Sequence, residues 1–179
     1  EAPLNRWDDI LLLLERLAPE KSLIPEAQSE RTQVFGLAHA ICGPLGFGWN
    51  RRLEGIHLGA EAGIAPGDFG EKYGYNKSDG EQARQRSINF LRYLTNILKS
   101  QKDKGGHYIV GDSLTAVDFY WAAFSNLAAI QSPKECPLAP EIRKRFERVA
   151  PEVSAAIDPI LIEHRDRIMH EYFKIPMEL

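Results

Sequence analysis

The stretch YIVGDSLTAVDFYWAAF, residues 108–124, constrains the fold of this chain more than any other part of its sequence. From Ala116 to Ile130 most residues are apolar, so the segment has almost no polar face to turn towards water. A helix that is apolar nearly all round belongs at the centre of a domain. The sequence therefore predicts a buried central helix over 116–130, with the other elements packed around it.

One acidic residue, Asp118, lies inside this apolar segment, where a charge without partners would be costly. If Thr115 is the N-cap, the Asp118 carboxylate can accept from the backbone N–H of Thr115, and the threonine hydroxyl can accept from the N–H of Asp118. The carboxylate also meets the positive end of the helix dipole. We interpret Thr115 and Asp118 as a structural capping box. The alternative role for Asp118 is a catalytic carboxylate, since acids with perturbed environments serve both purposes.

Elsewhere the apolar residues recur at steps of three and four, and almost none alternate with a period of two. This pattern predicts α-helices and no sheet. Gly43 and Pro44 interrupt one apolar stripe, which predicts two helices on either side of a bend, with a hollow beside it. The spacing of Ser78 and Glu81 predicts a second capping box at the start of a long helix. The expected fold class is all-α, a helical bundle.

Residues 59–80 contain six of the chain's 14 glycines and show no helical or strand periodicity. They are predicted to form a loop. A structureless connection of this length is uncommon in a compact domain and is often a lid or binding loop. The aromatic residues Phe69, Tyr73 and Tyr75 favour a lid, because aromatic rings in a polar loop usually have a surface to fold against. A mobile solvated insertion is the alternative.

The charge and the polar residues exclude several classes of function. A net charge of −3 over 179 residues provides no basic field for a nucleic-acid backbone. The longest apolar run, ILLLL at 10–14, is far shorter than the roughly 18 residues of a bilayer-spanning helix. Cys42 and Cys136 lack a nearby second ligand, and the spacing of His164 and His170 does not place both rings on one helix face. We expect no nucleic acid, no membrane, no metal and no disulfide, in a cytoplasmic protein.

Five residues at the bend and in the loop are candidates for a substrate-binding site beside the largest hollow: His39, Phe47, Trp49, Arg52 and Tyr73. Aromatic side chains near a glycine-rich bend can line an apolar pocket. Arg52, like its neighbour Arg51, can bind a carboxylate through two parallel hydrogen bonds. Ordinary roles remain open for each of them: a partly buried histidine, core packing for Trp49, and surface ion pairs for the two arginines.

The segment GDSLTAVDF resembles the box that opens the central helix of the C-terminal domain of glutathione transferases, with Gly111, Thr115 and Asp118 at its three marked positions. Further upstream, RTQVFGLAHAI followed by PL at 44–45 is similar to the first long helix of that domain. RWDDILLLLERLAPEKSLIP resembles the last helix of the family's N-terminal thioredoxin-like domain and the linker. The resemblance implies a remnant of the thioredoxin-like domain over 1–24 and a glutathione transferase C-terminal-like helical domain over 25–179.

The resemblance also implies a division of labour. In the family, the thioredoxin-like domain binds glutathione and supplies the residue that activates or receives its thiol, while the helical domain provides the pocket for the second substrate. Nearly all of the first domain is missing here, so we expect no catalytic residue in this chain and no cofactor bound by it alone. The complete protein is expected to use glutathione as co-substrate, to act on a small hydrophobic electrophile, and to form a homodimer.

One departure from the family pattern concerns glutathione itself. Many members carry a Glu-Ser pair just ahead of the last helix of the first domain, where it holds the glutamyl end of glutathione. Arg6 and Trp7 stand at these positions here, which counts against ordinary glutathione binding. A second function therefore stays open, a non-catalytic module of the same fold that binds other proteins.

Overall fold

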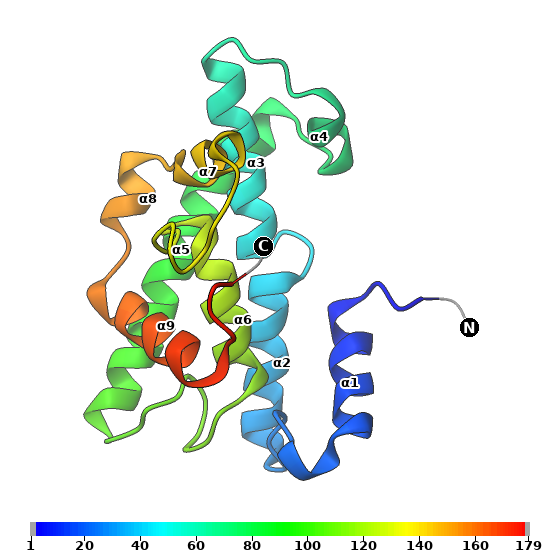
Figure 1. Ribbon diagram of the computed structural model, residues 1–179, viewed down its shortest axis with the longest axis vertical. Helices are drawn as coiled ribbons and strands as arrows, with labels where there is room; N and C mark the ends of the chain where they lie inside the picture. Colours follow the sequence, from blue (N-terminus) through cyan, green and yellow to red (C-terminus); the bar gives the residue numbers. More distant parts are fainter. Residues whose placement is uncertain (1–2, 178–179) are drawn as a thin grey trace.

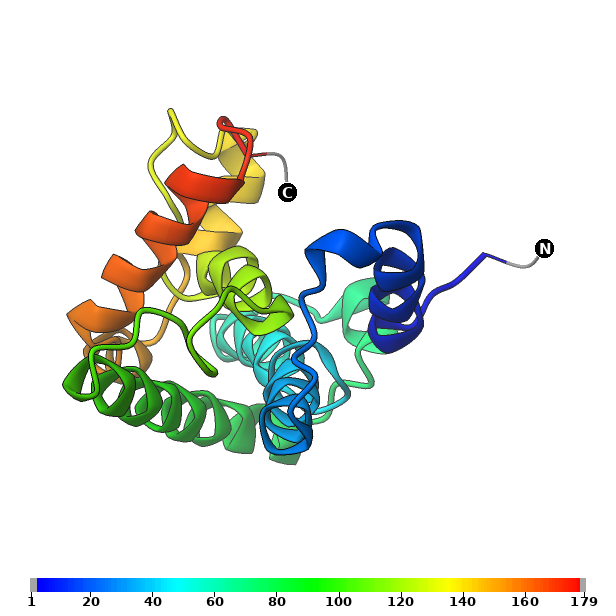
Figure 2. The same cartoon turned by 90° about the horizontal axis from the view of Figure 1, so that it is seen from below.

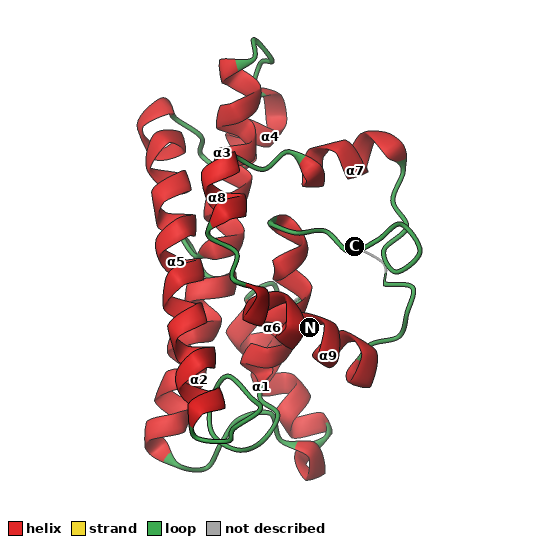
Figure 3. Ribbon diagram, turned by 90° about the vertical axis from the view of Figure 1, so that its left-hand side faces the viewer, coloured by secondary structure: helices red, strands yellow, loops and turns green. Residues whose placement is uncertain are grey.

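The computed structural model describes residues 3–177, and within this range the chain forms helices and no strand (Figures 1 and 3). The expected all-α fold class is confirmed. None of the described helices combines the length and the apolar composition needed to cross a lipid bilayer. The α-helices are α1 (Trp7–Leu17), α2 (Gln28–Cys42), α3 (Phe47–Glu61), α4 (Gly67–Lys72), α5 (Lys77–Asp103), α6 (Ala116–Phe124), α7 (Pro140–Glu147), α8 (Pro151–Ala155) and α9 (Pro159–Tyr172), with 3-10 turns η1 (Pro19–Lys21) and η2 (Ser125–Leu127).

The apolar helix α6 lies at the centre, between α2 and α9 (Figure 2). Its Trp121 is 1% exposed and donates from Nε1 to the carbonyl of Leu161 in α9 at 3.0 Å. The long helix α5 packs along α3 and also contacts α8 and α9. Leu11 of α1 joins the same core. The chain around residue 23 is tied to α6, because the carbonyl of Leu23 accepts from the N–H of Ala116 at 3.0 Å.

Two helix boundaries differ from the sequence prediction. The central helix ends at Phe124 rather than Ile130 and continues as the 3-10 turn η2. At this point Ser125 Oγ donates to the carbonyl of Ala122 at 2.8 Å, and Asn126 accepts from the N–H of Gln131 at 2.9 Å. Such side-chain bonds compete with the helical pattern.

The predicted capping box of Ser78 and Glu81 is wrong. Helix α5 begins one residue before Ser78, and its N-cap is Asn76, whose side chain accepts from the N–H of Asp79 at 2.9 Å. Asparagine is among the strongest N-cap residues, so the helix begins at this earlier cap.

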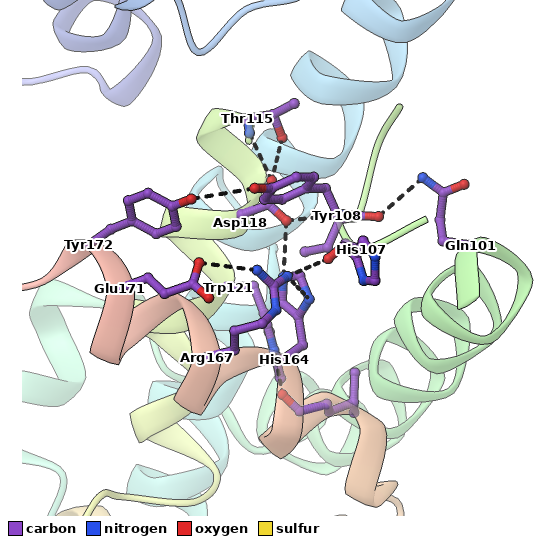
Figure 4. Close-up of polar contacts among 12 residues, drawn as sticks. Gln101, His107, Tyr108, Thr115, Asp118, Trp121, His164, Arg167, Glu171 and Tyr172 are labelled. Carbon is purple, nitrogen blue, oxygen red and sulfur yellow. Dashed lines mark hydrogen bonds and ion pairs between the residues drawn. The ribbon is translucent and has the colours of Figure 1, made fainter. Parts of the chain in front are cut away.

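The capping box at the start of α6 is present as predicted, and it is part of a larger network (Figure 4). Asp118 is fully buried. Its Oδ2 accepts from the backbone N–H of Thr115 at 2.8 Å and from the hydroxyl of Thr115 at 2.9 Å. Its Oδ1 accepts from the N–H of Ile109 at 3.0 Å and lies 2.9 Å from Nε2 of His164 in α9. One carboxylate thus joins the helix start, the preceding segment and α9.

The segment before the box is held from two other directions. Gln101 of α5 donates from Nε2 to the carbonyls of Tyr108 and Gly111, at 3.1 and 3.0 Å. Arg167 of α9 donates to the carbonyl of His107, and its guanidinium lies 5.1 Å from the centre of the Tyr108 ring. Residues 107–111 are therefore fixed between α5, α6 and α9, as the labelled side chains in Figure 4 show.

We predict that Asp118→Ala lowers the free energy of unfolding by about 3–5 kcal/mol, because it leaves buried donors on three elements without an acceptor. Thermal and urea unfolding measure the change. Asp112→Ala is the matched control, since this aspartate belongs to the same segment but is exposed and should cost less than ~0.5 kcal/mol. Thr115→Ala should combine non-additively with Asp118→Ala. An unchanged melting temperature for Asp118→Ala would contradict the role of the network.

Candidate functional site

The bend between α2 and α3 is a tight, internally bonded turn. Leu45 has a φ of 56°, the left-handed conformation that residues with a side chain seldom adopt. Asn50 in α3 holds this turn, because its Nδ2 donates to the carbonyls of Leu45 and Gly46 at 2.5 and 3.0 Å. A Cβ on Gly46 would meet three carbonyl oxygens at 2.9 Å, so only glycine fits there. The turn places α3 directly after α2 along the molecule (Figure 1).

The segment predicted as a loop over 59–80 contains structure of its own. Helix α3 extends to Glu61, and α4 occupies Gly67–Lys72. Gly67, the first residue of α4, and Gly74, two residues after its end, both have positive φ angles, of 56° and 61°. Such glycines allow the sharp changes of direction that set a single helical turn between two longer helices. The prediction of a structureless loop is therefore wrong, whereas the aromatic residues of this segment do fold against a surface.

That surface is the start of α3. The Tyr73 ring lies edge-on to Trp49 of α3, with ring centres 5.1 Å apart, and to Phe69 of α4, at 4.9 Å. The guanidinium of Arg52 lies 5.6 Å from the centre of the Tyr73 ring and 5.9 Å from that of Phe124 in α6. We call Trp49, Phe69, Tyr73 and Phe124 with Arg52 the Tyr73 cluster. It brings together three of the five predicted site residues, Trp49, Arg52 and Tyr73.

Arg52 differs from a typical surface arginine. It is half-buried, and its Nη1 donates to the carbonyl of Gly48 at 2.8 Å. No carboxylate among residues 3–177 lies within ion-pair distance of it, so the expected surface ion pair is not found there. Gly48 is in close contact with the ring of Phe124, on which Arg52 also lies. A Cβ on Gly48 would approach this ring to 2.4 Å.

The other two predicted site residues lie apart from the Tyr73 cluster. His39 is exposed at the end of α2, with its ring 6.4 Å from Trp7 of α1. Phe47 is 1% exposed and packs on Phe90 and Trp121, with ring centres at 5.2 and 5.7 Å, so it belongs mainly to the core. Both also border a hollow of about 200 Å³ beside the bend.

This hollow is not the largest one, contrary to expectation. A hollow of about 510 Å³ lies between α2, the end of α5 and the segment before α6. It has mostly polar walls: Glu30, Gln33, Asn96, Ile97, Ser100, Gln101, Lys104, Ile109, Gly111 and Asp112. At the Tyr73 cluster, by contrast, the aromatic side chains pack on one another, and the hollow beside the bend is the smaller one of about 200 Å³.

A series of buried polar groups on α3 was not predicted from the sequence. Arg51 is 4% exposed and pairs with Glu54, which is fully buried. Burial lowers the pKa of Arg51, and the charge of Glu54 opposes that shift. Arg51 Nε also donates to the carbonyl of Leu127 in η2 at 3.0 Å. The expected surface ion pair of Arg51 is thus a buried one. Its sequence signal is a spacing of three residues, which is equally common on exposed helices.

The same series of polar groups continues towards α4 and α5. Arg84 of α5 lies 3.6 Å from Glu54 and 3.9 Å from Glu61. His57 lies 3.5 Å from Glu61 through Nε2 and 3.0 Å from the hydroxyl of Tyr75 through Nδ1. These contacts fasten the segment after α4 to α3. They explain why Tyr75 faces α3 and does not join the Tyr73 cluster.

The remaining reactive groups are poorly placed for catalysis. Burial raises the pKa of Cys42 to about 12, so its thiol stays protonated at neutral pH and is a weak nucleophile. Burial also raises the pKa of Cys136. Within residues 3–177 no three histidine, cysteine, aspartate or glutamate side chains are grouped so that they could hold a metal ion.

We predict opposite effects of alanine at two glycines of α3. Gly48→Ala should destabilise the protein by about 1–3 kcal/mol, because the added methyl group displaces the Phe124 ring and with it the stacked Arg52. Gly55→Ala is the matched control: its Cβ would meet nothing within 4 Å, and alanine should stabilise the helix by about 0.5–1 kcal/mol. Thermal unfolding measures both. Equal stability of the two variants would show that Phe124 moves aside without cost.

Comparison with known proteins places part of this chain in a family. Residues 69–156 match the family model described as the C-terminal domain of glutathione S-transferase. Neither the comparison with curated proteins nor that with solved structures gave a match. The matched range runs from α4 to the end of α8 and includes Tyr73, Thr115 and Asp118. With the helical fold and the capping box of α6, residues 69–156 of this chain belong to the glutathione S-transferase C-terminal domain family.

Proposed function

We propose that this chain is the substrate-binding helical part of a glutathione S-transferase-like enzyme. The complete protein would use glutathione as co-substrate, in conjugation or thiol transfer to a small hydrophobic electrophile. The thiol-activating group would come from an N-terminal thioredoxin-like domain, of which residues 1–24 are the last helix and the linker. Residues 25–179 form the helical domain of this proposal, which acts in the cytoplasm as a homodimer.

The observation that supports this proposal is the uncovered apolar face of α1. Ile10, Leu14 and Leu17 are 41, 53 and 71% exposed, whereas Leu11 is buried in the core. Positions spaced by three and four residues form one stripe on a helix. An apolar stripe of this kind normally packs against another element. The thioredoxin-like domain implied by the family is the occupant that we propose.

Helix α4, which carries Phe69 of the Tyr73 cluster, lies on the same side of the molecule as α1. Helices α1 and α4 both stand on one side of the column formed by α2 and α3 in the two perpendicular views (Figures 1 and 2). Phe69, which is 47% exposed, presents its ring at the surface of the Tyr73 cluster. A domain docked on α1 would therefore face the aromatic side chains of α3 and α4, and a substrate would bind between them.

A second candidate function, a non-catalytic module for protein interaction, is favoured by the start of α1. Arg6 bonds to Asp8 at 2.7 Å and lies 3.5 Å from Asp9. Trp7 packs against Phe35 and Tyr120, with ring centres at 6.2 and 6.0 Å. These are the two residues that stand where many relatives of this family hold the glutamyl end of glutathione. The Arg6 side chain is instead engaged by acidic residues of α1 itself, and the Trp7 side chain packs against the helical domain.

Binding of an uncharged fluorescent probe, N-phenyl-1-naphthylamine, tests the proposed site. We predict that Trp49→Ala and Tyr73→Ala each weaken the affinity by about fivefold, since an aromatic contact contributes ~1 kcal/mol. Tyr93→Ala is the matched control, because Tyr93 is 57% exposed on α5 and far from the Tyr73 cluster in sequence. Leu14→Ser reports binding to the face of α1. A loss of affinity in Leu14→Ser but not in Trp49→Ala would contradict a site at the Tyr73 cluster.

We also predict that this chain alone has no transferase activity. Without a group that stabilises the glutathione thiolate, the reactive fraction of the thiol at neutral pH stays small and the thiol is not held near the substrate. Glutathione and 1-chloro-2,4-dinitrobenzene, followed by absorbance, measure the rate, with a complete glutathione transferase as positive control. Turnover above the buffer rate by this chain would overturn the proposed division of labour.

A further inference from the structure

The guanidinium of Arg52 is held in place by one hydrogen bond, while the three N–H donors of its Nε and Nη2 atoms have no partner among residues 3–177. Its Nη1 is bonded to the carbonyl of Gly48, and the rings of Tyr73 and Phe124 both lie within 6 Å. The edge formed by Nε and Nη2 has no hydrogen-bond partner among residues 3–177, and neither atom is among the buried polar atoms without one. This edge is therefore open to solvent and already oriented.

The other arginines of the same region have acidic partners. Arg51 and Arg84 pair with Glu54, and Arg86 lies 3.7 Å from Asp79. Two acidic residues, Asp68 and Glu71, belong to α4, the helix that packs over Arg52 through Tyr73, yet neither comes within ion-pair distance of it. Arg52 thus keeps a positive charge without a counter-ion in a partly apolar setting.

A second cation reinforces the positive character of the Tyr73 cluster. The ammonium of Lys72 lies 5.9 Å from the centre of the Tyr73 ring, the same ring that Arg52 approaches to 5.6 Å. Two cations beside one ring raise the local potential for an anion, and partial burial strengthens the interaction over its value in water. The exposed Phe69 provides an apolar surface next to them.

We propose that Arg52 selects substrates that carry an acidic oxyanion group, a carboxylate or a sulfonate, on an apolar aromatic body. This inference rests on the proposed function and names the substrate class of that same site. The free Nε and Nη2 edge of Arg52 donates two parallel hydrogen bonds to the oxyanion, the geometry in which guanidinium and carboxylate match best. The aromatic body packs against Phe69 and Tyr73.

The test compares two fluorescent probes with the same aromatic body: anilinonaphthalene sulfonate, which carries an acid, and N-phenyl-1-naphthylamine, which does not. Each is titrated into the full chain as wild type, Arg52→Gln and Arg52→Lys. Arg31→Gln is the matched control, because Arg31 also lies over an aromatic ring, at 5.2 Å from the centre of Phe35. Circular dichroism and melting temperature verify that every variant is folded.

We expect Arg52→Gln to weaken binding of the sulfonate about tenfold, the effect of losing a charge-assisted hydrogen-bond pair, and to leave the uncharged probe unchanged. Arg52→Lys keeps the charge but loses the planar fork, so it should retain part of the preference. Arg31→Gln should alter neither affinity. Added salt should weaken the binding of the sulfonate and leave the binding of the uncharged probe unchanged.

Two failures are distinguishable. If Trp49→Ala weakens the binding of both probes, but Arg52→Gln does not weaken the sulfonate more than the uncharged probe, the site stands and the acid preference is overturned. If neither probe depends on Trp49 or Tyr73, the proposed function loses its site as well. If Arg52→Gln does not fold, Arg52→Lys provides the test. The inference is overturned if Arg52→Lys prefers the sulfonate over the uncharged probe as strongly as the wild type does, and if added salt does not weaken this preference.

Discussion

The carboxylate of Asp118 is the interaction on which the arrangement of the helices depends. An ionised carboxylate has about four acceptor positions, and here four donors surround it: the N–H and hydroxyl of Thr115, the N–H of Ile109 and the ring of His164. Because Asp118 is fully buried, each bond is strong and each absent bond would be costly. The charge fixes the start of α6, and through it the positions of α2 and α9, which pack on either side.

Helix α3 has two sides with different chemistry, and two adjacent arginines separate them. Successive residues of a helix point about 100° apart, so Arg51 turns towards η2 and the buried Glu54, while Arg52 turns towards Tyr73 and Phe124. One guanidinium is buried, pairs with Glu54 and ties α3 to η2. The other keeps free donors at the surface. The division gives α3 a face of buried ion pairs and a face with free hydrogen-bond donors.

The parts of this fold that depend on neighbouring residues could be predicted from the sequence. The Thr115–Asp118 box is a pattern within four residues, and the apolar steps of three and four indicated helices throughout. His164 could not be assigned to Asp118, because the two are 46 residues apart and nothing local records their contact. Helix α4 was missed because glycines interrupt its periodicity. For the site, Trp49, Arg52 and Tyr73 were recognised as polar-aromatic candidates, but sequence alone does not distinguish the orientation of Arg52 from that of Arg51.

The buried pair of Arg51 and Glu54 has a consequence for how this protein can change its sequence. Removing one partner leaves the other as a charge in a dry interior, whereas replacing both with apolar residues of similar volume is often neutral or favourable. We therefore expect the two positions to change together: a sequence that keeps only one of the two charges should fold poorly, and natural variants should keep both residues or lose both. Arg52, with no such partner in the described chain, can be replaced without leaving a buried charge unpaired.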